Sequence, residues 1–304
     1  MRVAAFDCGT NSIRLLIADI DGDNFREIYR GMEIVRLGQG VDETGQFHPE
    51  AIERTFTAID NFVIEIRRRG VEKIRFCATS AARDATNRDI FLDGVHERLG
   101  LYPEVISGNE EAALSFSGAS RELPASEGPF LVVDIGGGST EFVFGRESVE
   151  SAKSVNIGCV RMSERHFHND PPSEIEIARA TADIRAAIAL AAAIVPIREA
   201  KTLIAVAGTA TTVAAAALGL SEYDPRAIHL TRISAEEVHT ISKTFLSMTH
   251  SRRAALPYMH PGRVDVIAAG ALVLSQIMEA TGAKEFVASE SDILDGMAWS
   301  LARG

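Results

Sequence analysis

The sequence predicts a two-lobed α/β protein that arose by internal duplication. Its 304 residues suit two lobes of about 150 residues each, and its apolar patterns alternate between strand-like and helical. A hairpin pattern, in which an Asp is followed by a Gly two positions later and a Ser five positions later, occurs twice. We expect lobes at 1–125 and 126–304, a cleft between them, and a last helix that packs back on the first lobe.

The first lobe is expected to open with a hairpin. Two apolar runs, Val3–Phe6 and Ile13–Ile20, flank the polar, Gly-containing turn Asp7–Ser12. A long amphipathic helix follows from Pro49, and Gly70 supplies its stop signal. The remaining elements predicted for this lobe are a strand at 73–78, a helix near 87–99 and a strand at 103–106.

The second lobe repeats this opening. The strand Phe130–Val133 leads through a turn at 134–140 into the return strand Glu141–Phe144. The preceding segment, Glu122–Gly128, is rich in small and turn-forming residues, so we place the lobe boundary there. Further helices are expected at 173–193, 234–247, 264–281 and 292–302, with strands at 203–206 and 285–288.

Composition and charge exclude several classes of protein. The net charge of -11 argues against broad capture of nucleic acid, which requires a basic face. The longest apolar stretch, Ala186–Ile197, is too short to span a bilayer and is flanked by charge, so no membrane association is expected. The start lacks a secretion signal, and Cys8, Cys77 and Cys159 lie far apart. These features predict a protein of the reducing cytoplasm.

Three turns rich in Gly, Ser and Thr each follow a short apolar strand. Small residues let the backbone approach an oxyanion closely, and successive N–H groups form a concave nest for anions. The third turn, Ala207–Thr212, also opens a helix and adds the positive end of its dipole. One such turn is usually a plain connection, but three together predict a phosphate site. The candidate residues are Gly9, Thr10, Asn11, Ser12, Gly136, Gly137, Gly138, Ser139, Thr140, Gly208 and Thr209.

Several blocks of sequence are more specific than these turns. The main ones are DCGTNSIRLLIAD (7–19), ISGNEEAALSF (106–116) and DIGGGSTEFVFG (134–145), joined by ATSAARDA (78–85), VAGTATT (206–212) and RVDVIAAGALVL (263–274). Together they resemble the exopolyphosphatase and guanosine-pentaphosphatase (Ppx/GppA) family. The resemblance implies the actin-like (ribonuclease H-like) ATPase fold, dependence on Mg²⁺, and removal of terminal orthophosphate from a phosphoanhydride chain.

The same resemblance assigns roles to individual residues. Glu111, the second Glu of SGNEEA, takes the place of the catalytic base that orients water. Asp134 and Glu141 take the acidic places that position metal and water, with Asp7 as a further metal ligand, and Arg83 takes the place that grips phosphate. The chemistry is consistent, because phosphoryl transfer needs a positioned water, a cation on the phosphate oxygens and donors around the transferred group.

Each of these residues also has a simpler interpretation. Glu110 and Glu111 together could merely favour a helix N-terminus, and outside the family context that explanation leads. Asp7 and Asp134 could be turn formers. Arg83 could pair with a neighbouring Asp on the surface. Only the flanking sequence blocks favour catalytic roles.

The substrate is less defined than the chemistry. Inorganic polyphosphate is the first expectation, and guanosine pentaphosphate (pppGpp) is the alternative, since no base-stacking aromatic is identifiable. A phosphate-ligand sensor without turnover is the rival from a different class. Longer family members continue beyond this length into helical domains, which favours short polyphosphate chains here. A homodimer is plausible from the family alone.

Overall fold

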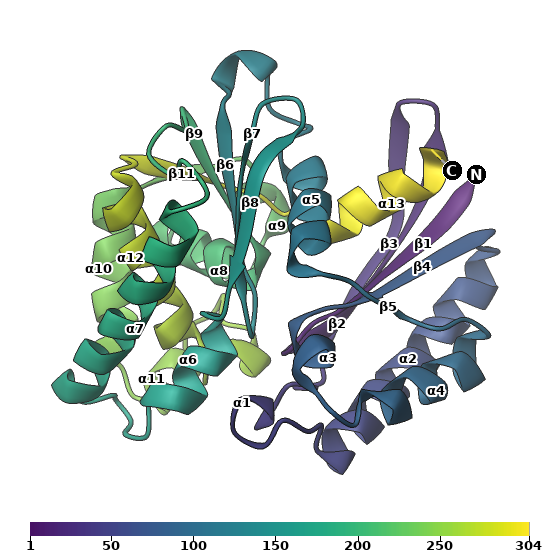
Figure 1. Cartoon of the computed structure of the whole chain (residues 1–304), viewed down its shortest axis with the longest axis horizontal. Helices are drawn as coiled ribbons and strands as arrows, with labels where there is room; N and C mark the ends of the chain where they lie inside the picture. Colours follow the sequence, from purple (N-terminus) through teal and green to yellow (C-terminus); the bar gives the residue numbers. More distant parts are fainter. Residues whose placement is uncertain (304) are drawn as a thin grey trace. The chain divides into compact units, whose positions relative to one another are not determined.

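The computed structural model describes residues 1–303 and divides into two compact units. The first unit comprises residues 1–118 together with the helix that begins at Ile293, and the second comprises residues 119–292. The lobe boundary expected after residue 125 falls within a short 3-10 helix, η1 (Ala125–Glu127), of the second unit. Each unit is built around its own mixed β-sheet (Figure 1).

The sheet of the first unit has five strands in the order β3-β2-β1-β4-β5. Their bounds are β1 (Arg2–Cys8), β2 (Ser12–Asp21), β3 (Asn24–Ile34), β4 (Lys73–Ala78) and β5 (Glu104–Val105). β1 pairs with β2 in antiparallel fashion and with β4 in parallel fashion, so β1 is the central strand. The carboxyl ends of β1, β4 and β5 therefore lie along one edge of the sheet.

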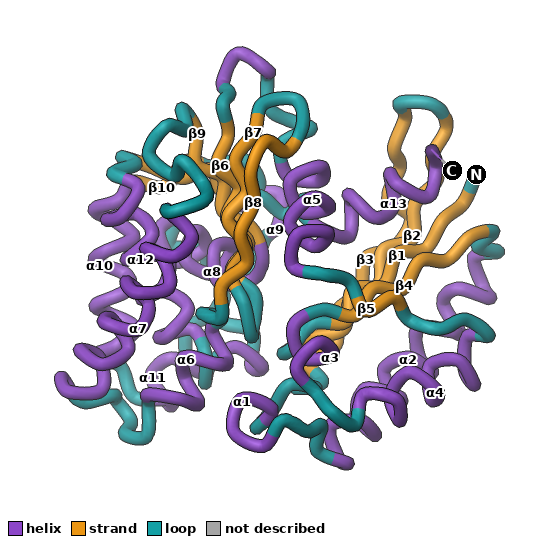
Figure 2. Tube along the Cα trace, in the orientation of Figure 1, coloured by secondary structure: helices purple, strands orange, loops and turns teal. Residues whose placement is uncertain are grey.

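Helices cover both faces of this sheet. They are α1 (Val41–Thr44), α2 (Pro49–Arg69), α3 (Ser80–Asp84), α4 (Arg88–Leu99), α5 (Gly108–Ala119) and α13 (Ile293–Arg303). One face buries Phe6 and Ile17 against Ile59 and Phe62 of α2. The other face buries Ala5 and other small residues against α13. The helix predicted from Pro49 is confirmed, with Gly70 as its left-handed C-cap (Figure 2).

The sheet of the second unit has six strands in the order β10-β11-β9-β6-β7-β8. Their bounds are β6 (Phe130–Ile135), β7 (Thr140–Gly145), β8 (Val149–Val155), β9 (Thr202–Val206), β10 (Arg232–Ser234) and β11 (Glu285–Ala288). β6 again pairs antiparallel with the next strand and parallel with β9. The central strand thus stands in the same relation to its neighbours as in the first unit.

Mostly apolar helices pack on this sheet. They are α6 (Cys159–His166), α7 (Glu174–Ala192), α8 (Ala207–Ala217), α9 (Pro225–Ile228), α10 (Ala235–Ser247), α11 (His250–Ala254), η2 (Pro261–Arg263) and α12 (Ile267–Thr281). α12 is buried along nearly its whole length and forms the centre of the core. The Ser234–Glu237 capping box at the start of α10 is present. Of the helices within residues 1–303, none has the length and apolar character that crossing a bilayer requires.

The two sheets repeat one topology. The order β3-β2-β1-β4-β5 corresponds to β8-β7-β6-β9-β11 with every pairing in the same orientation, and β10 is an addition. The predicted duplication is therefore confirmed. The sequence did not predict β3, β8 or β10. These strands lie at sheet edges, and β3 has no buried residue, so they lack the apolar alternation that marks a strand in a sequence.

Candidate active site

The first hairpin turn closes with one backbone bond. Gly9 N–H donates to the Ser12 carbonyl oxygen over 2.9 Å, and Gly38 N–H, from the segment after β3, donates to the Thr10 carbonyl over 2.9 Å. The Thr10 Oγ1 hydroxyl is buried and has no hydrogen-bond partner among residues 1–303. Buried hydroxyls are normally hydrogen-bonded, so an unpartnered one in this turn is consistent with a ligand, and phosphate binding by Thr10 stays a prediction.

Asp7 lies at the start of this turn. Its Oδ2 accepts hydrogen bonds from Arg14 Nε at 3.0 Å and from Arg14 Nη2 at 2.6 Å. Asp7 and Arg14 are directly opposed in the β1–β2 register, so both side chains lie on one face of the sheet. Asp7 is thus held by a cation of its own hairpin, and its membership of a metal site stays a prediction.

Arg83 and Glu111 meet at the same edge of the first sheet. α3 follows β4 and carries Arg83, while α5 follows β5 and carries Glu111 in its first turn. Arg83 Nη1 donates to Glu111 Oε2 over 2.7 Å and to the Ile106 carbonyl over 3.0 Å. Because β1, β4 and β5 are parallel neighbours, this pair and the Gly9–Ser12 turn belong to one edge. Arg83 does not pair with a surface Asp here.

The second hairpin turn is held by backbone hydrogen bonds from the start of α6. Gly136 N–H donates to the Ser139 carbonyl over 3.0 Å, which repeats the bond of the first turn. The Gly137 carbonyl accepts from Val160 N–H at 2.9 Å and from Arg161 N–H at 3.1 Å. These bonds point the carbonyl groups of the turn toward the start of α6. Binding of an anion by the N–H groups of Gly137, Gly138 and Ser139, as in a nest, stays a prediction.

Two acids face each other beside this turn. Asp134 and Glu141 are directly opposed in the β6–β7 register, and their exposed fractions are 6% and 0%. Ser154 Oγ donates to Glu141 Oε1 over 2.7 Å and fixes that carboxylate from β8. Like charges directly opposite each other destabilise a sheet, so a buried acid pair favours a cation between or beside the carboxylates.

The third predicted turn is part of a helix. α8 begins at Ala207, directly after β9, and the chain turns through a left-handed φ of 65° at that residue. The interpretation of Ala207–Thr212 as a separate turn before the helix is therefore wrong, because one left-handed residue suffices to redirect the chain. Gly208 and Thr209 lie in the first helical turn, which has no side-chain cap. Their N–H groups remain suited to an anion.

The second turn and the start of α8 lie next to each other. β6 and β9 are parallel neighbours, with Asp134 in register with Val206. Cys159 connects the two regions, since its N–H donates to the Gly136 carbonyl over 2.9 Å, and both Cys159 and Thr209 lie against Gly270 of α12. Burial raises the pKa of the Cys159 thiol. The second unit thus brings its predicted phosphate-binding residues to one edge.

Sequence reasoning gave no functional role to the three arginines that lie near these turns. Arg263 lies over Gly208, where a Cβ would come within 0.9 Å of Arg263 Nη1, so a larger residue at 208 would displace the guanidinium. Arg161 Nε donates to the Gly138 carbonyl over 2.7 Å, and Arg14 holds Asp7. The available signal was position, because Arg14 lies within the first Gly-containing block, and Arg161 and Arg263 each follow a single nearby glycine. Nothing in their spacing distinguished them from surface arginines.

The donor set suits Mg²⁺ but supplies few ligands. Within residues 1–303, no group of three or more His, Cys, Asp or Glu side chains is arranged to hold a metal ion. The opposed pair Asp134 and Glu141 provides two carboxylates on one sheet face. Mg²⁺ is usually bound through one or two carboxylates, with water and substrate phosphates completing its shell. The pair therefore fits this ion.

The duplicated mixed sheets, with Gly-rich hairpin turns at the ends of their central strands, define the class as an actin-like α/β protein. The chain belongs to the Ppx/GppA phosphatase family, whose model matches residues 16–303. It is 46% identical to "Exopolyphosphatase 2" of Mycobacterium tuberculosis over 99% of this chain and 98% of that protein. A solved structure described as an exopolyphosphatase-like protein superposes with a TM-score of 0.96 at 43% identity, covering 100% of this chain and 99% of that one.

Relatives named for a guanosine substrate are less similar, and one of Aeromonas salmonicida is 27% identical over 98% of this chain and 59% of its own length. A guanosine-5'-triphosphate,3'-diphosphate pyrophosphatase of Vibrio atlanticus is 39% identical over 54% of this chain and 33% of its own length. The family and the exopolyphosphatase relatives identify the chain as a phosphoanhydride hydrolase.

Proposed function

We propose that the chain is an exopolyphosphatase, which hydrolyses the terminal phosphoanhydride of inorganic polyphosphate and releases orthophosphate. The observation that carries the proposal is the Arg83–Glu111 pair at 2.7 Å, at the sheet edge that also carries the Gly9–Ser12 turn. Support also comes from the relative named an exopolyphosphatase, which is similar over nearly the full length of both chains.

Glu111 orients the attacking water and accepts its proton. Glu111 is 8% exposed, and its carboxylate is ion-paired with Arg83, which holds it in one orientation. A positioned general base of this kind contributes about 10²–10⁴-fold to a rate. Arg83 has further donors beyond those used for Glu111 and Ile106, and a guanidinium can grip phosphate oxygens with them.

The turns hold the phosphate chain through backbone N–H groups and hydroxyls. Gly9–Ser12 and Gly136–Thr140 supply these donors, and Gly208 and Thr209 add the start of α8. Asp134 and Glu141 would hold Mg²⁺ in the second unit, while metal binding by Asp7 in the first unit stays a prediction. When bound, the ion neutralises charge on the phosphate oxygens as the transferred group is released.

The alternative substrate is guanosine pentaphosphate, which would use the same hydrolytic residues. Its support is the similarity to proteins named for that substrate, which covers 54% of this chain at 39% identity in one relative and 98% at 27% identity in another. The decisive assay measures phosphate release from short polyphosphate, long polyphosphate, guanosine pentaphosphate and ATP, each with Mg²⁺ present or chelated. Fastest turnover of guanosine pentaphosphate would replace the proposal with the alternative. Faster digestion of long than of short polyphosphate would refute the expected preference for short chains.

Glu111→Gln tests the assigned base directly. We expect at least about a 100-fold loss of phosphate release, because the amide orients water poorly and accepts no proton. Glu110→Gln is the matched control, since Glu110 is the exposed neighbour that pairs with Arg75. Retained activity in Glu111→Gln, or an equal loss in the control, would contradict the assignment. Tight polyphosphate binding by the wild type without any turnover would indicate a sensor instead.

A further inference from the structure

Helix α7 lies at the surface of the second unit and exposes an apolar face (Figure 1). Its opposite face packs on α12, β8 and α6 and buries Ala180, Ile184 and Ile188. The solvent side of such a helix is normally polar, yet Ile175 is 66% exposed and Leu190 is 63% exposed. Between and beside them lie exposed alanines, which are Ala178, Ala182, Ala186, Ala189 and Ala193. At about 3.6 residues per turn these positions share one side of the helix, which we name the α7 face.

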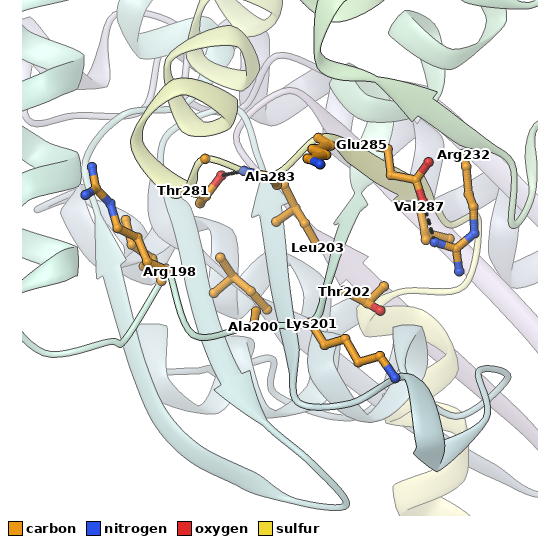
Figure 3. Close-up of a pocket in the computed structure, with 14 residues that line it drawn as sticks. Arg198, Ala200, Lys201, Thr202, Leu203, Arg232, Thr281, Ala283, Glu285 and Val287 are labelled. Carbon is orange, nitrogen blue, oxygen red and sulfur yellow. Dashed lines mark hydrogen bonds and ion pairs between the residues drawn. The ribbon is translucent and has the colours of Figure 1, made fainter.

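The fold fixes both ends of the α7 face. At its start, Ser173 and Glu176 form a capping box, in which Ser173 N–H donates to the Glu176 carboxylate over 2.7 Å. Just beyond its end, Arg198 Nε donates to the Ala280 carbonyl over 2.9 Å. Figure 3 shows Arg198 and Arg232 at opposite sides of a pocket below this segment. A surface that is already ordered loses little conformational freedom when a partner binds.

The side-chain sizes on the α7 face are complementary about the level of Ile184. Each large residue has a small counterpart at the same distance along the helix on the other side of Ile184. The pairs are Ile175 with Ala193, Ala178 with Leu190, and Ala182 with Ala186. Two antiparallel copies of the helix, related by a twofold axis at this level, place the members of each pair opposite each other. The large side chains of one copy then pack on alanines of the other, and the central alanines allow a close approach.

The charges beside the α7 face follow the same symmetry. Asp183 and Arg185 lie one position on either side of Ile184, on opposite flanks of the face, so the twofold axis brings Asp183 of each copy level with Arg185 of the other. Both are ion-paired within their own copy and partly exposed, so the new contacts would extend existing pairs. Arg179 forms no ion pair within residues 1–303 and comes level with Ala189, in the last turn of the other helix, where a cation is favoured.

From this self-complementarity we propose that the α7 face binds a second copy of this chain, with the two α7 helices antiparallel. A different partner would require no relation between the two halves of one helix. A parallel pair would place each Arg179 beside its own counterpart and each Leu190 against the other, so it lacks both kinds of complementarity. One helix from each copy buries less than the roughly 1,200–2,000 Å² of a standard interface, so we expect an affinity in the micromolar range. The proposal does not depend on the substrate.

Sedimentation equilibrium on the full chain, from about 1 to about 200 µM, measures the association. The wild type should form a dimer that dissociates on dilution. Leu190→Glu should raise the dissociation constant at least about 100-fold, because each dimer loses two buried leucines and gains two buried charges. Ile64→Glu is the matched control, since Ile64 of α2 is 62% exposed and lies in the first unit. Circular dichroism should show both variants folded like the wild type.

Disulfide formation tests the orientation of the two helices. The native cysteines Cys8, Cys77 and Cys159 are buried, so thiols introduced on the α7 face are the accessible ones. Ala182→Cys protein mixed with separately tagged Ala186→Cys protein should form the mixed disulfide faster than either variant links to itself, because positions 182 and 186 are opposed only in the antiparallel pair.

Three results would overturn the proposal. The first is a wild type that stays monomeric over the whole concentration range, which would leave the α7 face to a different partner. The second is a dimer that Leu190→Glu does not weaken, or that Ile64→Glu weakens equally. The third is a predominance of disulfides between identical positions, which would exclude the antiparallel arrangement.

Discussion

In the first hairpin Arg14 lies opposite Asp7, whereas in the second hairpin Glu141 lies opposite Asp134. The backbones are otherwise alike, with the same strand order around them and the same closing bond from a Gly N–H to a Ser carbonyl. The first hairpin neutralises its acid internally. The second places two acids together, an arrangement that a bound cation would stabilise. One duplicated scaffold thus supports two different electrostatic environments.

The support of the two turns is also duplicated. In each unit, the segment after the outer strand of the opening hairpin approaches the turn at a glycine. This residue is Gly38 after β3 in the first unit and Gly158 after β8 in the second. A Cβ at Gly38 would come within 2.3 Å of the Thr10 side chain, and one at Gly158 within 2.2 Å of the Gly137 carbonyl oxygen. The first contact is with a side chain and the second with backbone, so the second turn tolerates less change.

The largest expected effect tests the difference in charge between the Asp7–Arg14 pair and the Asp134–Glu141 pair. The variant is Glu141→Gln. Loss of one of two carboxylates should weaken the activation by Mg²⁺ about 100-fold, measured as the Mg²⁺ concentration that gives half-maximal phosphate release. Glu150→Gln, on the exposed part of β8, is the control. An unchanged requirement for Mg²⁺ in Glu141→Gln would mean that the two hairpins do not differ in metal binding.

The difference in turn support is tested by two alanine substitutions. Gly158→Ala should destabilise the protein by about 1–3 kcal/mol and reduce activity, because backbone must shift to make room. Gly38→Ala should cost less, and Thr10→Ser should partly rescue it by removing the methyl group that the new Cβ meets. Chemical denaturation of the single and double variants measures these effects. Equal costs without rescue would show that the two turns are equally constrained.

A smaller effect is expected from the residue that orients Glu141. Ser154→Ala removes the 2.7 Å hydrogen bond to Glu141 Oε1, and outer partners of metal ligands typically contribute about tenfold or more to metal affinity. Ser151→Ala on the same strand is the control, since the Ser151 hydroxyl has no partner among residues 1–303. If both variants keep wild-type activation by Mg²⁺, Ser154 has no role in positioning the carboxylate.

The smallest effect concerns a second Arg–Asp pair in the first hairpin. Hydrogen bonds from Arg2 and Arg26 hold the pKa of Asp19 well below its ordinary value of 3.8. A lowered folded-state pKa means that the stabilisation is present above about pH 4 and is lost as the pH falls below that value. Asp19→Asn should therefore lower stability by less than about 1 kcal/mol at pH 7, since the pair is partly exposed.

Unfolding of wild type and Asp19→Asn at several pH values measures this difference, which should shrink as the pH falls below 4. Asp21→Asn, at the exposed end of β2, is the control. A difference between wild type and Asp19→Asn that stays constant from pH 7 to pH 3 would show that the charge of Asp19 is not its source.

The sequence alone predicted the elements whose apolar residues form a strong pattern, either a continuous run or one face of a helix. The central strands, the helix from Pro49 and the repeated Asp–Gly–Ser turn are examples, because buried strands and amphipathic helices need those patterns in any context. The sequence also indicated the turn residues at the carboxyl ends of the central strands, since Gly-rich turns after apolar strands have a local signature. The edge strands β3 and β8 lacked such a signature and were missed.

Only the tertiary structure decided which residues face each other. The register of β1 with β2 and of β6 with β7 placed Arg14 opposite Asp7 and Glu141 opposite Asp134, and the crossing of α12 with α8 brought Gly270 against Thr209. The ion pair of Arg83 with Glu111 likewise joins two helices that follow different strands. Such contacts depend on strand order and close packing, which link residues distant in the chain and leave no local trace in its sequence.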